Sequence, residues 1–196
     1  MPGSSNGRDI RMAEKTDQEL IHGAQRGDRA SFSLLVERHY RFMFKVAWQW
    51  GGIREDAEDI AQEASMKLAG HIGDFRFESA FTTWLYRLVI NTAKDYYKVK
   101  NRKNSREGQL FEDVDYVSPE LSPEEKIMSK DVLKAIAELP ETLRETIILV
   151  CWQQLSHKEA AEALQCQEGT ISWRVHEARK KIAESLDMKK KGKSYE

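Results

Sequence analysis

The sequence predicts an all-α protein, made of two small helical domains joined by an acidic linker. Apolar residues recur at three- and four-residue spacing along most of the chain, which is the period of an amphipathic helix. Three segments begin with the Ser/Thr-x-x-Glu pattern of a helix capping box. Between residues 107 and 121 the periodicity stops and acidic residues occur without lysine or arginine. Such a change of composition indicates a linker.

The first domain is expected over residues 16–106, after a disordered tail at 1–15 that is rich in glycine, serine and asparagine. Thr16 and Glu19 form a capping box for a short helix that ends near Gln25. A long amphipathic helix is expected over residues 30–50, and the pair Gly51-Gly52 ends it. Its apolar stripe consists of Phe32, Leu35, Val36, Tyr40, Met43, Phe44 and Ala47.

The next helix is expected over residues 55–71. Its early acids, residues 55–59, suit the positive end of the helix dipole. Gln62 and Glu63 lie a turn further on, where the dipole does not account for them, and are candidates for a docking surface. The apolar stripe of this helix consists of Ala57, Ile60, Ala61, Ala64, Met66 and Leu68.

An aromatic and basic stretch follows, over residues 75–106. Residues 75–79 are expected to form a loop, because glycine and turn residues precede them. Aromatic rings beside a basic track are how proteins hold single-stranded nucleic acid. We expect Phe81, Trp84 and Leu85 in the core, while Phe75 and Arg76 fit either the core or a nucleic-acid site. The opposite helix face carries Thr83, Arg87, Asn91, Lys94 and Lys98.

The second domain is expected over residues 122–187, followed by a basic tail at 188–196. Ser122, Pro123 and Glu125 begin one helix, and a second is expected over 141–153 in spite of its strand propensity. The capping box at Ser156 then opens a short helix, a turn, and a long helix, which is the helix-turn-helix pattern. The long helix presents a face suited either to a DNA groove or to solvent: Ser172, Trp173, Arg174, His176, Arg179 and Lys180.

Composition limits the remaining possibilities. No apolar run approaches the roughly 20 residues of a membrane span, and the N-terminus lacks the apolar centre of a signal peptide, so we expect a cytoplasmic protein without membrane insertion. Cys151 and Cys166 show no metal-type pairing with histidine, and we interpret both as buried thiols. We expect no cofactor and no metal. The net charge of -1 conceals strong segregation of basic from acidic segments.

Two stretches resemble the bacterial RNA polymerase sigma factors. Residues 139–182 resemble region 4 of that family through the segments LPETLR, LSHKEAA and GTISWRVHEAR. Residues 56–96 resemble region 2 through DAEDIAQE and TWLYR. The short linker leaves no room for a region 3 domain, which is typical of the extracytoplasmic-function (ECF) group, and the region 2 segments are most similar to its envelope-stress type.

The resemblance implies a promoter-specificity subunit of RNA polymerase. Its implied partners are core RNA polymerase, promoter DNA as a duplex −35 element and a melted −10 element, and an anti-sigma factor. Polymerase would be bound by Asp56, Asp59, Gln62 and Glu63. The −10 element would be bound by Lys67, Phe75, Arg76, Glu78, Ser79, Thr83, Arg87, Asn91, Lys94 and Lys98. The helix from residue 168 would enter the −35 major groove.

The sequence departs from the family at Ser172-Trp173, at Glu177, and at Phe77, where relatives carry a glycine. These departures indicate an unusual promoter. One alternative is a self-sufficient helix-turn-helix regulator, which would bind palindromic duplex sites without polymerase. An enzyme is disfavoured because the sequence has no Gly-rich phosphate loop and no His-Cys metal cluster.

Overall fold

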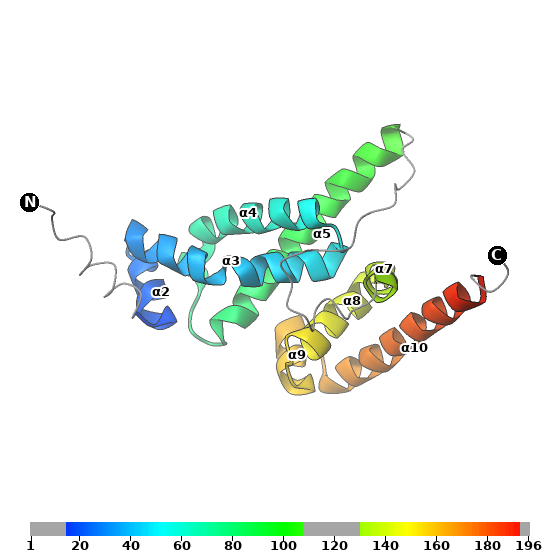
Figure 1. Cartoon of the computed structure of the whole chain (residues 1–196). Helices are drawn as coiled ribbons and strands as arrows, with labels where there is room; N and C mark the ends of the chain where they lie inside the picture. The colour runs from blue at the N-terminus through cyan, green and yellow to red at the C-terminus, as the bar shows by residue number, and fades with distance from the viewer. Residues whose placement is uncertain (1–14, 108–129, 193–196) are drawn as a thin grey trace, which may run out of the picture.

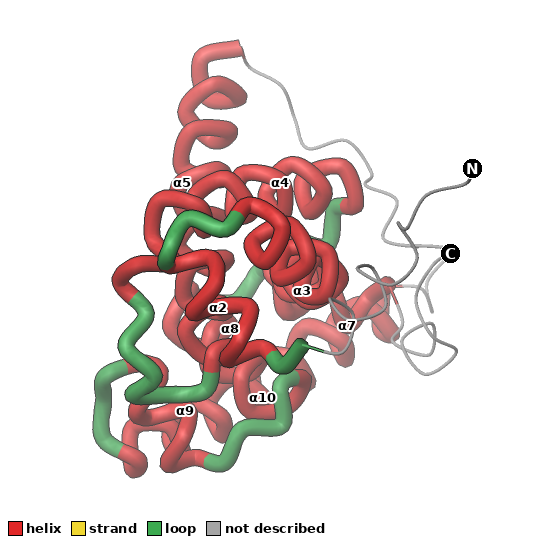
Figure 2. Tube along the Cα trace, turned by 90° about the vertical axis from the view of Figure 1, so that its left-hand side faces the viewer, coloured by secondary structure: helices red, strands yellow, loops and turns green. Residues whose placement is uncertain are grey.

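The computed structural model describes residues 15–107 and 130–192, and within these ranges its regular structure is helical throughout (Figures 1 and 2). The elements are α2 (Asp17–Gln25), α3 (Arg29–Gly51), α4 (Arg54–His71), the 3-10 turn η1 (Ile72–Asp74), α5 (Phe81–Glu107), α7 (Lys130–Ala137), α8 (Glu141–Ile147), the π-helical turn η2 (Ile148–Trp152), α9 (His157–Leu164) and α10 (Glu168–Gly192).

The first helical unit packs α3, α4 and α5 together, and α2 covers one end of α3. The expected helix signals are present. Thr16 accepts a hydrogen bond from the Glu19 backbone while the Glu19 carboxylate accepts from the Thr16 backbone, which completes the predicted capping box. Gly52 ends α3 in the left-handed conformation, with a φ of 74°. Leu35, Met43, Ile60 and other stripe residues are fully buried between these helices.

The second unit contains the helix-turn-helix, formed by α9 and α10. The capping box of Ser156 and Glu159 begins α9 as predicted. Gln165 ends α9 in the left-handed conformation, with a φ of 51°, and the chain turns into α10. α10 crosses α7, α8 and α9 and buries Ile171 and Ala178 against them. The predicted helix start at Ser122 and the predicted acidic linker at 107–121 lie outside the described residues, except for Glu107, which ends α5.

Several predictions of burial are wrong. Met66 is 66% exposed and Tyr40 is 39% exposed, although both fall on predicted apolar stripes. Cys151 is exposed and Cys166 is only half-buried, so neither is a fully buried thiol. The π turn explains Cys151, because Gln153 donates to the Ile148 carbonyl five residues back. That wider turn keeps Ile148 and Leu149 in the core and leaves Cys151 facing outward.

One of the two hydrophobic clusters of the described residues extends across both units. Leu133, Ile148 and Leu149 belong to the same buried cluster as the residues between α3, α4 and α5. At their junction the Arg144 guanidinium lies 4.7 Å from the centre of the Trp50 ring and donates to the Trp50 carbonyl at 3.2 Å. The described residues therefore form a closed arrangement, with α7 and η2 against α3 and with α9 against α5.

Among the described helices, none combines the length and the apolar character of a membrane span.

Candidate nucleic-acid interface

The loop between η1 and α5 is anchored to α2 at its base. Gln25 donates from Nε2 to the carbonyl oxygens of Ile72 and Phe75, at 3.0 and 2.9 Å. The Phe75 ring is 4% exposed and packs against Phe81 and Trp84, with ring centres 5.4 and 5.6 Å apart. Phe75 therefore belongs to the core, which answers the question that the sequence left open. Gln25 carries no motif that would have indicated its role.

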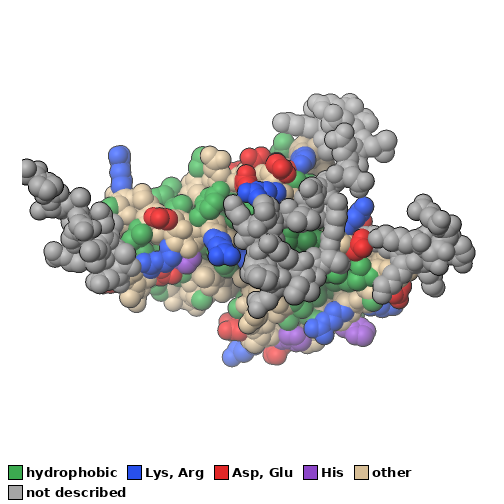
Figure 3. Space-filling model, in the orientation of Figure 1, with side chains coloured by type: hydrophobic (Ala, Val, Ile, Leu, Met, Phe, Trp, Pro, Cys, Tyr) green, Lys and Arg blue, Asp and Glu red, His purple; other side chains and the backbone are tan. Residues whose placement is uncertain are grey.

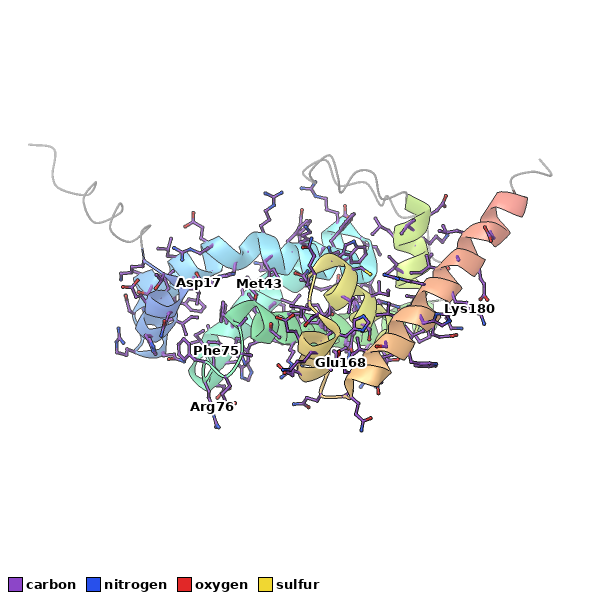
Figure 4. The ribbon with its side chains drawn as sticks, turned by 90° about the horizontal axis from the view of Figure 1, so that it is seen from below. Asp17, Met43, Phe75, Arg76, Glu168 and Lys180 are labelled. Atoms are coloured by element: carbon purple, nitrogen blue, oxygen red, sulfur yellow. The ribbon has the colours of Figure 1, made fainter. Side chains whose placement is uncertain are left out.

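The rim of this loop is exposed. Arg76, Glu78 and Ser79 face solvent, and Figure 4 shows Arg76 pointing away from the ribbon. Phe77 is also exposed, at 39%, and has a φ of 61°. Its ring centre lies 4.5 Å from the His22 ring of α2 and 4.8 Å from the Phe75 ring. The aromatic surface that this loop offers to a ligand thus comes from Phe77, which was not among the predicted site residues.

Lys67 lies between two carboxylates at the junction of α4 and α5. Its ammonium is 3.0 Å from Glu63 and 3.4 Å from Asp95. Partial burial would lower the pKa of Lys67, but the two carboxylates more than offset it and raise that pKa. Lys67 is therefore a fully charged cation held by Glu63, a predicted polymerase contact.

Two of the predicted −10 contacts on α5, Arg87 and Lys94, face the second unit. Arg87 donates from Nε to the Ala163 carbonyl at 2.5 Å and from Nη2 to the Glu162 carbonyl at 2.6 Å. These acceptors are at the C-terminal end of α9, which is the negative end of its dipole. Lys94 pairs with Glu145 of α8. Both cations are thus engaged within the closed arrangement, whereas Lys98 is exposed and Thr83 is half-buried.

Buried contacts reinforce this junction. The Tyr86 hydroxyl donates to the Glu145 backbone carbonyl at 3.1 Å. Burial, with a contribution from the Glu145 charge, raises the pKa of Tyr86 well above its usual value, so the hydroxyl keeps its proton. Next to it a cavity of about 340 Å³ is lined by Arg87, Asn91 and Lys94 of α5, facing Glu145 of α8 and residues 163–165. Three predicted −10 contacts therefore line the seam between the units.

The predicted polymerase contacts on α4 divide into two kinds. Asp56 has a 4% exposed side chain and accepts from Lys100 Nζ at 2.6 and 2.7 Å and from the Tyr96 hydroxyl at 3.0 Å. Burial and then the Asp56 and Asp59 carboxylates raise the pKa of Tyr96. Asp59 and Gln62 are exposed and Glu63 is half-exposed. Asp56 thus positions α5, whereas Gln62 faces solvent, Asp59 accepts from the Tyr96 hydroxyl at 3.2 Å and Glu63 pairs with Lys67.

Most of the predicted −35 contacts lie at the surface of α10. Ser172, Trp173, His176, Arg179 and Lys180 are all exposed, and Arg174 is half-buried. Trp173 is 61% exposed. His157 of α9 contacts the Ser172 hydroxyl at 2.9 Å, which ties the two helices of the motif together. Figure 3 shows basic and histidine side chains along the outer edge formed by α10, and Figure 4 places Lys180 on the same helix.

Among the described residues no group of histidine, cysteine, aspartate and glutamate side chains has the arrangement of a metal site.

Comparison with known proteins identifies the family. The model of the family described as "Sigma-70 region 2" matches residues 35–103. The model of the family described as "Sigma-70, region 4" matches residues 129–182. The sigma-H factor of Pseudomonas aeruginosa is 33% identical over 89% of this chain and 96% of its own length. The ECF sigma-E factor of Haemophilus influenzae is 35% identical over 89% of this chain and 98% of its own length. The chain belongs to the ECF sigma factors.

Solved sigma factors have the same fold. RpoE of Bartonella quintana, solved in complex with the anti-sigma factor NepR, has a TM-score of 0.61 and 26% identity, over 79% of this chain and 93% of that one. CnrH, solved with the cytosolic domain of CnrY, has a TM-score of 0.62 at 23% identity, over 88% of this chain and 97% of that one. The predicted all-α fold with regions 2 and 4 is confirmed. A sigma factor is a transcription initiation factor, and its family is not an enzyme family.

Proposed function

We propose that this sigma factor recognises and opens promoters with three separate binding surfaces. The rim of the loop and the basic face of α5 bind the melted −10 strand. The exposed face of α10 enters the −35 major groove, and Asp59, Gln62 and Glu63 of α4 dock on core polymerase in the cytoplasm. The separation of these surfaces on different helices carries the proposal. α10 exposes an aromatic, a histidine and two cations, which suits base edges and phosphates.

The closed arrangement must open for this function. Arg87 cannot donate to the carbonyls of α9 and also neutralise a DNA phosphate with the same N–H groups. Lys94 is likewise paired with Glu145. Core polymerase can separate the two helical units only by binding the open form more tightly than the closed form. The described arrangement is therefore a resting form of the free protein.

A protein inhibitor would hold the protein in that resting form. The Bartonella quintana relative is described in complex with an anti-sigma factor. Such an inhibitor could bind the hollow between α4 and α5 that Glu63 and the exposed Val99 line, and the exposed Met66 of α4 would add apolar surface. We assign this chain an anti-sigma partner that competes with core polymerase.

Start-site mapping tests the proposal. Purified bacterial core polymerase transcribes genomic DNA fragments with and without this protein, and the 5′ ends of the products are mapped. We expect new start sites that require the protein and share −35 and −10 sequences at constant spacing. If none occurs, and the protein alone protects a palindromic duplex, then it is a self-sufficient regulator and the proposed surfaces are wrong.

A further inference from the structure

We infer that Phe77, supported by His22 of α2, is the stacking platform for one unstacked base of the melted DNA strand. The inference rests on the proposed function, since it assumes that this loop holds single-stranded DNA. It identifies the ligand as a nucleobase of the non-duplex strand, and it identifies the aromatic ring that binds it.

Phe77 is the aromatic residue of the loop that a base can reach. Phe75 and Phe81 are 4% and 8% exposed and pack on one another, so their faces are covered by protein. Phe77 is 39% exposed, and the rings in contact with it are those of His22 and Phe75. The His22 and Phe77 rings are tilted by 33°, which leaves part of the Phe77 ring open to solvent.

The backbone at Phe77 shows that its ring is held there at a cost. With a φ of 61°, residue 77 is in the left-handed region, where a side chain with a Cβ is strained and a glycine is not. A half-exposed ring beside an open loop is weak compensation for that strain. Strained residues of this kind cluster at ligand sites. The left-handed backbone conformation places the Phe77 ring at the exposed rim of the loop, beside the buried Phe75 ring.

The neighbouring groups suit a nucleotide. Arg76 and Ser79 are exposed on either side of Phe77, and can supply a cation for the phosphate and a hydroxyl for a base edge. Stacking on an aromatic ring accepts every base, because each base has a π face. Phe77 therefore contributes to the affinity for melted DNA more than to the choice of sequence.

The test measures binding of single-stranded DNA to the holoenzyme formed by core polymerase and this protein. A randomised pool of short single strands is first enriched on the wild-type holoenzyme, and the winning strand is resynthesised with an abasic site at each position in turn. Variants Phe77→Gly and Phe77→Trp are compared with Tyr40→Ala, which removes an equally exposed aromatic side chain from another element, α3.

We expect Phe77→Gly to bind the intact strand about tenfold more weakly, the loss of one base-aromatic stack. Phe77→Trp and Tyr40→Ala should retain the wild-type affinity. One abasic strand should bind equally to wild type and to Phe77→Gly, because the stacked base is missing from it. The thermal midpoint of Phe77→Gly should stay at the wild-type value or rise, since glycine relieves the strained φ.

An intact-strand affinity of Phe77→Gly equal to that of wild type overturns the inference, as does an equal loss on every abasic strand. If the glycine variant melts at a lower temperature, Phe77→Leu decides, because leucine keeps an apolar contact with His22 and lacks a ring. Equal affinities of the leucine and tryptophan variants then overturn the inference, and weaker binding by leucine supports it. Failure of the wild type to enrich any strand contradicts the proposed function itself.

Discussion

At the scale of single residues, Asp56 is buried and paired within the protein, although its motif predicts a docking contact. It belongs to the acidic segment DAEDIAQE, and the resemblance assigns it to polymerase docking. In the structure its carboxylate is buried and accepts from Lys100 and Tyr96 of α5. Buried carboxylates persist in proteins when they are paired and hydrogen-bonded in this way. Asp56 therefore fixes α5 against α4, and we expect its replacement to affect docking only through this packing.

Replacing Asp56 by alanine should destabilise the fold by about 2 kcal/mol, because it leaves the Tyr96 hydroxyl and the Lys100 ammonium without their shared acceptor. Urea denaturation followed by circular dichroism measures the change in the free energy of unfolding. Gln62→Ala, an exposed position on the same helix, is the matched control and should change it by less than about 0.5 kcal/mol. Equal stabilities of the two variants would contradict the structural role of Asp56.

At the scale of helices, the sequence predicted most of the fold. Apolar periodicity located the helices, and the capping boxes at Thr16 and Ser156 located two of their starts. Prediction from periodicity failed where a tertiary contact or an irregular turn overrides the local pattern. The π turn at residues 148–152 rotates Cys151 outward, and Met66 extends from α4 beyond the packed interface. Neither the left-handed Phe77 nor the anchor at Gln25 follows from periodicity, since both depend on α2 meeting the loop.

Alanine substitutions at two helical glycines should change the stability of the protein in opposite directions. A Cβ at Gly51, where α3 meets α5, would lie 1.7 Å from the Tyr97 hydroxyl oxygen and 2.5 Å from its ring carbon Cζ. Gly51→Ala should therefore cost about 1–3 kcal/mol of stability, because the ring must move. A Cβ at Gly70 in α4 would meet no atom within 4 Å. Gly70→Ala should stabilise the protein by about 0.5–1 kcal/mol through helix propensity.

Both glycine variants are measured by thermal and urea unfolding of the full chain. If Gly51→Ala is as stable as wild type, then α3 and α5 are further apart than the structure has them.

At the scale of the whole molecule, the closed arrangement could not have been predicted from the sequence. Tyr86 donates to Glu145 across 59 positions in the chain, and Arg87 reaches Glu162 across 75. Each of these residues fits a solvated or DNA-binding face when its own helix is considered alone. The sequence identified the candidate residues on α5 and α10 by their chemistry, but their engagement within the protein depends on tertiary packing.

Reversing the charge of Lys94 should open the molecule. Glu145, its partner, has an 11% exposed side chain, so Lys94→Glu would place two carboxylates together in a poorly solvated seam. We expect a larger radius of gyration in small-angle X-ray scattering. Lys98→Glu, one turn further along α5 and exposed, is the matched control and should leave the radius unchanged.

Restoring the pair with reversed charges provides the converse check. The double variant Lys94→Glu with Glu145→Lys should return the radius of gyration toward the wild-type value. An unchanged radius in Lys94→Glu would show that this ion pair does not hold the two units together.

The most direct test of the account is permanganate footprinting on a promoter identified by start-site mapping. Permanganate oxidises thymines that are unstacked and unpaired, so it reports melting at single positions. We expect reactive thymines within the −10 element only when core polymerase and this protein are both present. Reactive thymines with core polymerase alone would contradict the account, and so would a duplex footprint by the protein alone without melting in the combined reaction.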